Sequence, residues 1–408
     1  MPEVHYQGKR PFLLIEGGPL YRIQRRVGLV RAQSPLIVRR AVFSIFITWV
    51  PLLVLSAISG FAVRNVELPF LKDIAAAARF LIAIPLLLIA EVITGPHLAQ
   101  GAGHLVDASL ILEKDYKEYD AAVESGLRLR DSTTAEIILV ILALATTLNA
   151  FRHNALHIST WFRLWLPSGG HITTAGWWYV LFSLPLFNFL AFRWLWRMFL
   201  WYRFLYQINS LDLQLFPTHP DQAGGLGFLA ESQQFFAVVF FGYSCAISGI
   251  VANEILYDTL KLDSFFAPLA IFLTLAVLIS LAPLAMFSGR LLKLRRAGIF
   301  RYGAFATTYT GDFQRKWIDP QVADPESDAQ VHGKPTVEET EPLLGTGDIQ
   351  SLADLGNSYS FITKMNIVPF DPKAVLRIII VCVIPMLPLL LTVMPLGELL
   401  KIALKMLA

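Results

Sequence analysis

The chain has 408 residues, of which 55% are hydrophobic and only 16% are charged, and its formal net charge is +3 at neutral pH. A soluble domain carries charge on about a quarter of its residues, so this composition excludes an ordinary soluble globular protein. The two cysteines, Cys245 and Cys382, both fall inside apolar stretches, which argues against a disulfide framework or a cysteine-ligated metal site.

Seven apolar runs, almost free of charge, predict transmembrane helices. A bilayer core of about 30 Å needs about 20 helical residues. Backbone in lipid must satisfy its own hydrogen bonds, so each run is expected to be helical. The runs are 41–63, 74–94, 133–151, 175–192, 234–253, 264–288 and 378–397. The predicted fold class is an all-α polytopic membrane protein with about seven transmembrane helices and helical cytoplasmic extensions.

The distribution of basic residues predicts the orientation. Of the 34 lysines and arginines, 26 lie in the four regions 1–40, 95–132, 193–233 and 289–377. By the positive-inside rule these regions are cytoplasmic, which places the N-terminus inside and the C-terminus in the periplasm. A six-span alternative, in which the third or the seventh run is re-entrant or peripheral, stays open.

This orientation predicts four parts along the chain. They are a basic cytoplasmic N-terminal segment (1–40), a six-helix membrane region (41–288), a cytoplasmic segment (289–373) and a seventh membrane helix with a C-terminal tail (374–408). The six-helix region includes a cytoplasmic helical hairpin at 95–132 and a polar loop at 204–233. Residues 319–347 are rich in proline, acidic residues and glycine, which predicts a disordered linker.

The densest group of polar residues follows the fourth run. Three arginines stand among tryptophans and tyrosines, and the sequence HPDQAGGLG comes next. Glycine-rich backbone, a following helix N-terminus and nearby arginines are typical of anion sites. The predicted ligand-binding residues are therefore His219, Asp221, Gly224, Gly225, Arg193, Arg197 and Arg203. The alternative is that the arginines anchor the helix at the membrane interface and that the glycines form a tight turn, with Asp221 capping the next helix.

Three further charges, Arg79, Glu91 and Glu254, lie in or at the end of apolar runs and are candidates for a pathway through the membrane. The alternative for Glu91 is a structural pair with an arginine of the fourth run. Arg79 either reaches the membrane surface or meets Glu254. Several prolines predict bends in the spans, and Thr133–Glu136 fits a capping box at the start of the third run.

No metal, cofactor or nucleic acid is expected. His97, His104 and Asp107 share one helix face, and His153 and His157 have i, i+4 spacing, but neither group belongs to a catalytic zinc pattern.

The motif HPDxxGGLG at 219–227 together with DIQSLADLGNSY at 348–359 resembles a family of uncharacterised bacterial multi-pass inner-membrane proteins. The resemblance implies a bacterial cytoplasmic membrane and implies no activity.

Three function classes remain. The first is a channel or transporter for a small ion or solute, possibly an anion, and the chain is expected to form a homo-oligomer. The second is a membrane sensor or scaffold with a cytoplasmic protein partner. The third is an enzyme acting on a lipid phosphate, with His219 and Asp221 as acid and base and the arginines as a phosphate clamp.

Overall fold

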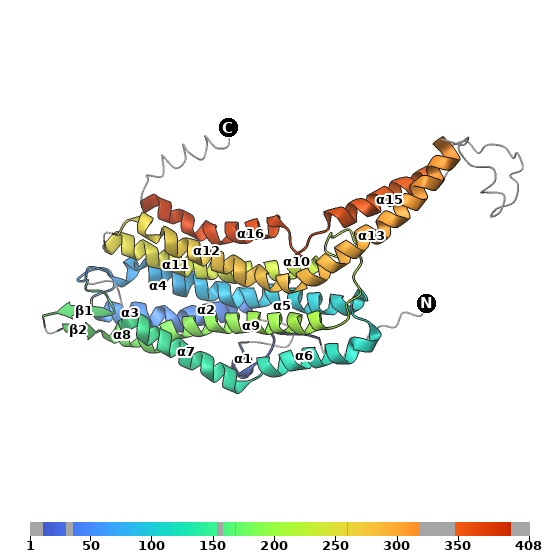
Figure 1. Cartoon of the computed structure of the whole chain (residues 1–408). Helices are drawn as coiled ribbons and strands as arrows, with labels where there is room; N and C mark the ends of the chain where they lie inside the picture. The colour runs from blue at the N-terminus through green and yellow to red at the C-terminus, as the bar shows by residue number, and fades with distance from the viewer. Residues whose placement is uncertain are drawn as a thin grey trace, which may run out of the picture. The chain divides into compact units, whose positions relative to one another are not determined.

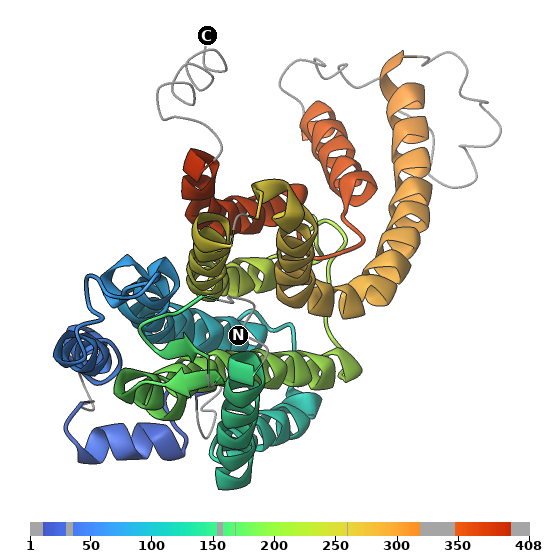
Figure 2. The same ribbon diagram turned by 90° about the vertical axis from the view of Figure 1, so that its left-hand side faces the viewer.

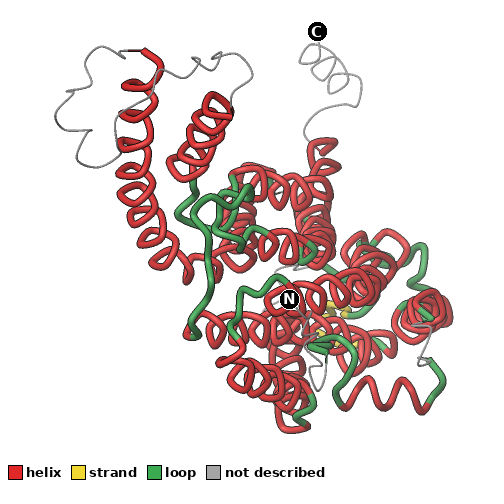
Figure 3. The backbone as a smooth tube through the Cα atoms, turned by 90° about the vertical axis from the view of Figure 1, so that its right-hand side faces the viewer, coloured by secondary structure: helices red, strands yellow, loops and turns green. Residues whose placement is uncertain are grey.

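The computed structural model describes residues 11–29, 36–152, 158–167, 169–258, 260–318 and 347–392, and this backbone is almost entirely helical (Figure 3). Seven helical stretches are long and apolar enough to cross a membrane: Ile37–Ile58, Ile74–Asp107, Thr133–Arg152, Thr174–Ser210, Phe228–Tyr257, Leu262–Ile318 and Pro372–Thr392. Each contains one of the predicted runs or most of it, so the predicted all-α polytopic membrane fold is confirmed. Within the described ranges, strands occur only in one short hairpin.

The helices are α1 (Pro19–Arg26), α2 (Ile37–Thr48), α3 (Val50–Ile58), α4 (Ile74–Ala77), α5 (Ile84–Asp107), α6 (Tyr116–Arg130), α7 (Thr133–Arg152), α8 (Thr174–Trp178), α9 (Leu184–Ser210), α10 (Phe228–Gln234), α11 (Ala237–Tyr257), α12 (Phe266–Leu281), α13 (Ser288–Phe313), α15 (Gly347–Lys364) and α16 (Pro372–Val383). The hairpin strands are β1 (Arg163–Leu166) and β2 (Gly169–Ile172), which pair antiparallel.

The chain forms two compact units. The first unit comprises residues 1–213, 231–283 and 372–408, and the second comprises 214–230 and 284–371. The predicted linker lies outside the described residues, except for Gly347, which begins α15.

Helices of the first unit pack in pairs. α2 packs against α5, α7 against α9, and α11 against both α4 and α16 (Figure 1). Small residues permit the close approach of α11, since a Cβ on Gly249 would lie 2.8 Å from the Cβ of Ala78. Asn188 donates to Thr147 at 3.0 Å and so links α9 to α7. Large apolar side chains such as Val38 and Ile58 are more than three quarters exposed, as expected for surfaces that face lipid.

Prolines mark the irregular parts of the spans, as the sequence predicts. Pro85 and Pro185 each follow a π-helical segment, Ala78–Ala83 in the second span and Tyr179–Ser183 in the fourth. Proline removes a helical hydrogen bond and clashes with the preceding turn, and an adjacent π-bulge is one way for a helix to accommodate this. In the sixth and seventh spans the proline-containing segments, Ala282–Phe287 and Ile384–Thr392, are 3-10 helical.

The predicted hairpin at 95–132 consists of the last turns of α5 and the separate helix α6. α6 does not continue into α7, because Asp131 and Ser132 interrupt the helix. The predicted capping box at Thr133–Glu136 is wrong in both of its contacts. The Ser132 hydroxyl accepts the N–H of Ala135 at 3.3 Å, and the Glu136 side chain turns elsewhere.

In the second unit, α15 lies alongside α13 (Figures 1 and 2). Asp348 at the start of α15 accepts from Lys316 at 2.8 Å and from the Trp317 indole at 3.0 Å. The amphipathic segment predicted to end near Gly356 is longer than expected, because α15 continues through this glycine to Lys364.

Candidate functional site

The first unit holds a buried group of charged side chains around Glu91. Its carboxylate accepts from Arg193 at 3.1 Å, from Arg197 at 2.7 Å and from Arg40. All four residues are at most 5% exposed. Arg193 and Arg197 reach the same carboxylate because they are four residues apart on α9. The pairing of Glu91 with arginines of the fourth span, the alternative given by the sequence, is therefore confirmed, and interfacial anchoring is wrong for these two arginines.

A second glutamate completes what we call the charge cluster, namely Arg40, Glu91, Glu136, Arg193 and Arg197. Glu136 of α7 lies 3.5 Å from the Nε of Arg193. Three arginines and two glutamates leave one positive charge in excess at neutral pH. In addition, the Nε–H of Arg40 is buried and has no hydrogen-bond partner among the described residues. The cluster thus has an excess positive charge and one N–H group that can donate a hydrogen bond to a further acceptor.

Residues 11–29, here called the N-terminal segment, cover the charge cluster with their backbone. The Ile15 carbonyl accepts from Arg197 at 3.2 Å, and the Gly17 carbonyl accepts from Arg193 at 3.3 Å. These oxygens are neutral dipoles, so they satisfy donors without removing the excess charge.

Two carboxylates hold the start of α1 in return. Asp131 accepts the Gly18 N–H at 2.8 Å, and Glu136 accepts the Leu20 N–H at 2.9 Å. These N–H groups at the start of a helix have no partner within it, and negative charge is favourable there. The Glu136 carboxylate therefore accepts a hydrogen bond from the start of α1 and does not cap the start of its own helix, α7.

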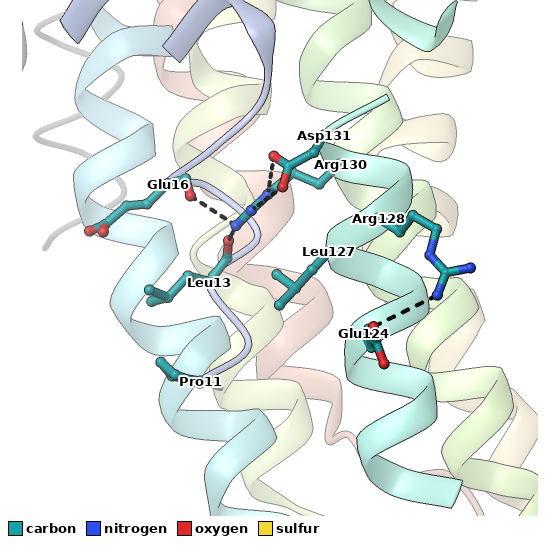
Figure 4. Close-up of a pocket in the computed structure, with 8 residues that line it drawn as sticks. All are labelled: Pro11, Leu13, Glu16, Glu124, Leu127, Arg128, Arg130 and Asp131. Atoms are coloured by element: carbon teal, nitrogen blue, oxygen red, sulfur yellow. Dashed lines mark hydrogen bonds and ion pairs between the residues drawn. The ribbon is translucent and has the colours of Figure 1, made fainter. Parts of the chain in front are cut away.

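Arg130 fastens the same segment from α6. Its guanidinium donates to the carbonyls of Leu13 and Glu16, the latter at 2.8 Å, and pairs with Asp131 at 2.7 Å (Figure 4). Burial raises the pKa of Asp131, but the hydrogen bond and charge of Arg130 outweigh this and hold the pKa below its usual value. A cavity of about 600 Å³ opens beside these contacts, between the N-terminal segment and α6.

Apolar contacts seal the segment in place. Phe12 is 2% exposed and stacks on Phe204 with ring centroids 4.3 Å apart. A Cβ on Gly126 would lie 2.7 Å from the Phe12 ring, and one on Gly95 would lie 3.1 Å from Ile15. Glycine at these two positions gives the segment the room to lie against the helices.

The predicted anion loop is organised by its own aspartate. Asp221 accepts the backbone N–H groups of Ala223 at 2.8 Å, Gly225 at 3.1 Å and Gly227 at 2.8 Å, and lies 2.7 Å from His219 Nδ1. Burial raises the pKa of Asp221, while the backbone donors and the His219 hydrogen bond lower it to a net value below the usual one. The donors that would bind a ligand anion are therefore occupied by an internal carboxylate.

Packing of this loop supports the tight-turn alternative. Gly224 and Gly225 have φ of +67° and +100°, which favour glycine. Gly224 packs against Leu291 and Leu294, which belong to the same second unit as the loop. Asp221 binds N–H groups that precede α10, so it shapes the loop and does not cap that helix. Neither anion binding nor catalysis by His219 and Asp221 gains support from these contacts.

The remaining predicted residues lie elsewhere. Arg203 donates to Ser125 at 2.9 Å and thus links α9 to α6. Arg79 donates to the Tyr179 hydroxyl at 2.8 Å, and it forms no ion pair with Glu254 although both line one cavity. The histidine pair at 153 and 157 is outside the described residues. Within the described ranges, no three His, Cys, Asp or Glu side chains are placed to hold a metal ion.

Sequence reasoning missed Arg40 and Glu136 as members of the charge cluster. Arg40 was one of many basic residues before the first run, and Glu136 resembled a helix cap. One signal was available, since a carboxylate inside an apolar run needs cationic partners at the same depth.

No protein-family model matches this chain, and no curated protein or solved structure is significantly similar to it. The function must therefore be argued from the residues themselves.

Proposed function

We propose that this chain is a channel or transporter for a small anion in a bacterial cytoplasmic membrane, with its N-terminus in the cytoplasm. The observation that carries the proposal is the charge cluster, which has one excess positive charge and a buried, unpartnered N–H on Arg40. An anion would balance the excess positive charge of the cluster and would accept the hydrogen bond that the Arg40 N–H can donate.

Stability alone gives no reason for such a cluster. Replacing a buried ion pair by apolar side chains of similar volume is often neutral or stabilising by about 1–4 kcal/mol. Ionisable residues within membrane spans are costly and mark ion pathways or relays by default. The buried position of Glu91 and its three arginines is thus better explained by a task than by folding.

The N-terminal segment supplies the closed state of this pathway. Its carbonyls at Ile15 and Gly17 occupy donors of Arg197 and Arg193 that an anion would use. An anion therefore competes with the segment for the same donors, and release of the segment opens the pathway. Broken membrane helices, as at Pro85 and Pro185, are common around transporter sites.

Flux measurements test this proposal. The purified full chain is reconstituted into liposomes, and chloride, nitrate and formate fluxes are followed across a range of pH and voltage. We expect anion flux above that of protein-free liposomes, a loss of about tenfold or more in Arg197→Gln because a charge-assisted contact is removed, and an increase in Phe12→Ala because the segment is released. Arg128→Gln changes an exposed arginine and is the matched control.

Absence of flux for every anion would overturn the proposal, as would equal fluxes in the Arg197 and Arg128 variants. A fold check by thermal melting accompanies each variant, since Arg197→Gln also alters the buried cluster.

A second candidate, a membrane scaffold with a cytoplasmic protein partner, is favoured by the length of the sixth helical stretch. It spans 57 residues, far more than the roughly 20 that a bilayer needs. Phe300 and Phe305 on α13 are 78% and 60% exposed. Co-purification of one stoichiometric partner by the wild type, lost in Phe300→Glu, would support this function, and isolation of the chain alone under mild detergent would count against it.

A further inference from the structure

The second and fourth spans begin with the same order of structural features, and equivalent positions are 100 residues apart in the sequence. The Asp73 carboxylate accepts the Ala76 N–H at 2.8 Å, and the Thr173 hydroxyl accepts the Gly176 N–H at 3.0 Å. The two N-caps and the two N–H groups they bind are thus offset by the same 100 residues. A short α-helix follows in each case, and then a π-helical segment.

The two π-helical segments place Arg79 and Tyr179 at equivalent positions, and these two side chains meet at 2.8 Å. Pro85 and Pro185 then end each irregular segment at equivalent positions. π-bulges are rare and frequently lie at functional sites. Here two of them are joined by a side-chain contact between Arg79 and Tyr179.

Two cavities adjoin this contact. The larger, of about 260 Å³, is lined mainly by apolar side chains, including Phe151, Phe162 and Phe187, and Arg79 is the only charged residue among its described lining residues. The smaller, of about 80 Å³, shares Arg79 and Tyr179 and is also lined by the acidic Asp73 and Glu254 and by Asn253. A guanidinium at one point of an otherwise apolar wall suits an amphipathic anion.

Arg79 forms no ion pair with any described residue. Within the described part of the chain, no carboxylate lies within 4.0 Å of its guanidinium. Two carboxylates, those of Asp73 and Glu254, line the smaller cavity with Arg79, and neither pairs with it. Both oxygens of Asp73 accept other donors, from Ala76, Asn253 and the Trp161 indole. Glu254 lines the smaller cavity and forms no ion pair with Arg79.

An arginine without an ion pair is unusual inside a membrane span, and Arg79 lies within one. It is the sixth residue of its span, about 8 Å along the helix from the start. It is half-buried, and its long side chain is held by Tyr179. An arginine in this position has up to five donors in a planar fork that matches an oxyanion.

We propose that the cavity beside Arg79 and Tyr179 binds an oxyanion that carries a short apolar tail, with the oxyanion on Arg79 and the tail among the phenylalanines. The volume is near the lower end of the range of about 300–1,000 Å³ for ligand pockets, so the occupant is small or is one end of a lipid. This site lies about 18 Å along the helix from Glu91 and is independent of any flux through the charge cluster.

Equilibrium binding tests the site without reference to transport. The full chain in nanodiscs of neutral phosphatidylcholine is titrated calorimetrically with straight-chain carboxylates from acetate to octanoate, and with the matching alcohols. We expect carboxylates to bind, the affinity to rise with chain length, and alcohols of equal length to bind at least tenfold more weakly. Arg79→Gln should lose about tenfold or more in affinity, and Tyr179→Phe should lose less. Arg64→Gln, an exposed arginine in the loop that precedes the same span, should leave the affinity unchanged.

A second arm distinguishes a lipid from a solute. Native mass spectrometry of the protein extracted from its own membrane asks whether an anionic lipid stays bound to the wild type and is lost in Arg79→Gln. Loss of such a lipid, or carboxylate affinity that depends on Arg79, supports the site and names the source of the anion. Equal behaviour of wild type and Arg79→Gln in both arms overturns the proposal. Arg79→Lys keeps the positive charge. The melting temperatures of Arg79→Gln and Arg79→Lys are compared with that of the wild type, so that a loss of affinity is separated from a folding defect.

Discussion

At Glu91, one carboxylate serves three guanidinium groups, and this fixes how the residue responds to substitution. Glu91→Gln leaves the arginines without their shared counter-charge, and removing one partner of a buried pair typically costs about 3–5 kcal/mol. We therefore expect a clear drop in the unfolding midpoint in detergent. The control is Glu124→Gln, whose exposed side chain pairs with Arg128 at 3.8 Å and should change stability by less than about 0.5 kcal/mol. Similar midpoints for the two variants would contradict this account of the charge cluster.

Asp221 gives a pH dependence with a defined sign. Its pKa in the folded chain is lower than in the unfolded chain, so its stabilising contribution is complete above the ordinary aspartate pKa of about 4 and is lost as the pH falls through the lower folded value. Hydrogen exchange at the amides of Gly225 and Gly227, corrected for intrinsic rates, should show protection that disappears only in acid. Asp221→Asn should reduce protection at neutral pH, where the wild-type carboxylate is charged, and should match the wild type in acid. Loss of wild-type protection already near neutral pH would show that another group controls the loop.

Among the elements, the N-terminal segment depends on α6 having glycine at one position. Gly126→Ala favours the helix by about 1 kcal/mol through its intrinsic propensity, yet the new Cβ would lie 2.7 Å from Phe12. We expect the segment to be released and the arginines of α1 to become more sensitive to trypsin. In Gly103→Ala the nearest atom to the new Cβ lies 3.7 Å away, so that variant should resist trypsin like the wild type. Equal digestion of both variants would contradict the proposed packing.

The spans were predictable because hydrophobicity and length are local properties of the sequence. The position of the N-terminal segment was not, because its backbone contacts join residues more than 100 positions apart, as between Gly18 and Asp131. Glu136 misled for a related reason. A glutamate three residues after threonine suits a capping box, but the N–H of Leu20 and the guanidinium of Arg193 compete for it from distant parts of the chain.

The common plan of the second and fourth spans was also invisible in the sequence. Its shared marks are one capping residue and one proline per span, and most of the residues between them differ, as Arg79 and Tyr179 do. For the candidate site, the sequence singled out Arg193, Arg197 and Glu91 but assigned the two arginines to the loop at His219. Only three-dimensional pairing separates these assignments.

For the whole molecule, the predicted orientation can be checked without a functional assay. Cys245 and Cys382 are buried, so single cysteines introduced at exposed positions report on topology. With the N-terminus inside, a membrane-impermeant maleimide should label Arg64→Cys in spheroplasts and should label Arg128→Cys only after lysis. The reverse pattern would invert the orientation, and labelling of both positions before lysis would rule out a single topology.

The long-range contacts of the charge cluster also imply an order of assembly during synthesis. Arg40 and Glu91 are 51 residues apart and can pair as soon as the second span enters the membrane. Arg197 follows Ile15 by 182 residues, which at about 5–20 residues per second amounts to roughly 10–40 s of translation. The N-terminal segment therefore reaches its full set of contacts only after nearly half of the chain has been made. Until the fourth span arrives, the N-terminal segment has no partner among Arg193 and Arg197, so Arg40 and Glu91 pair before that segment can cover them.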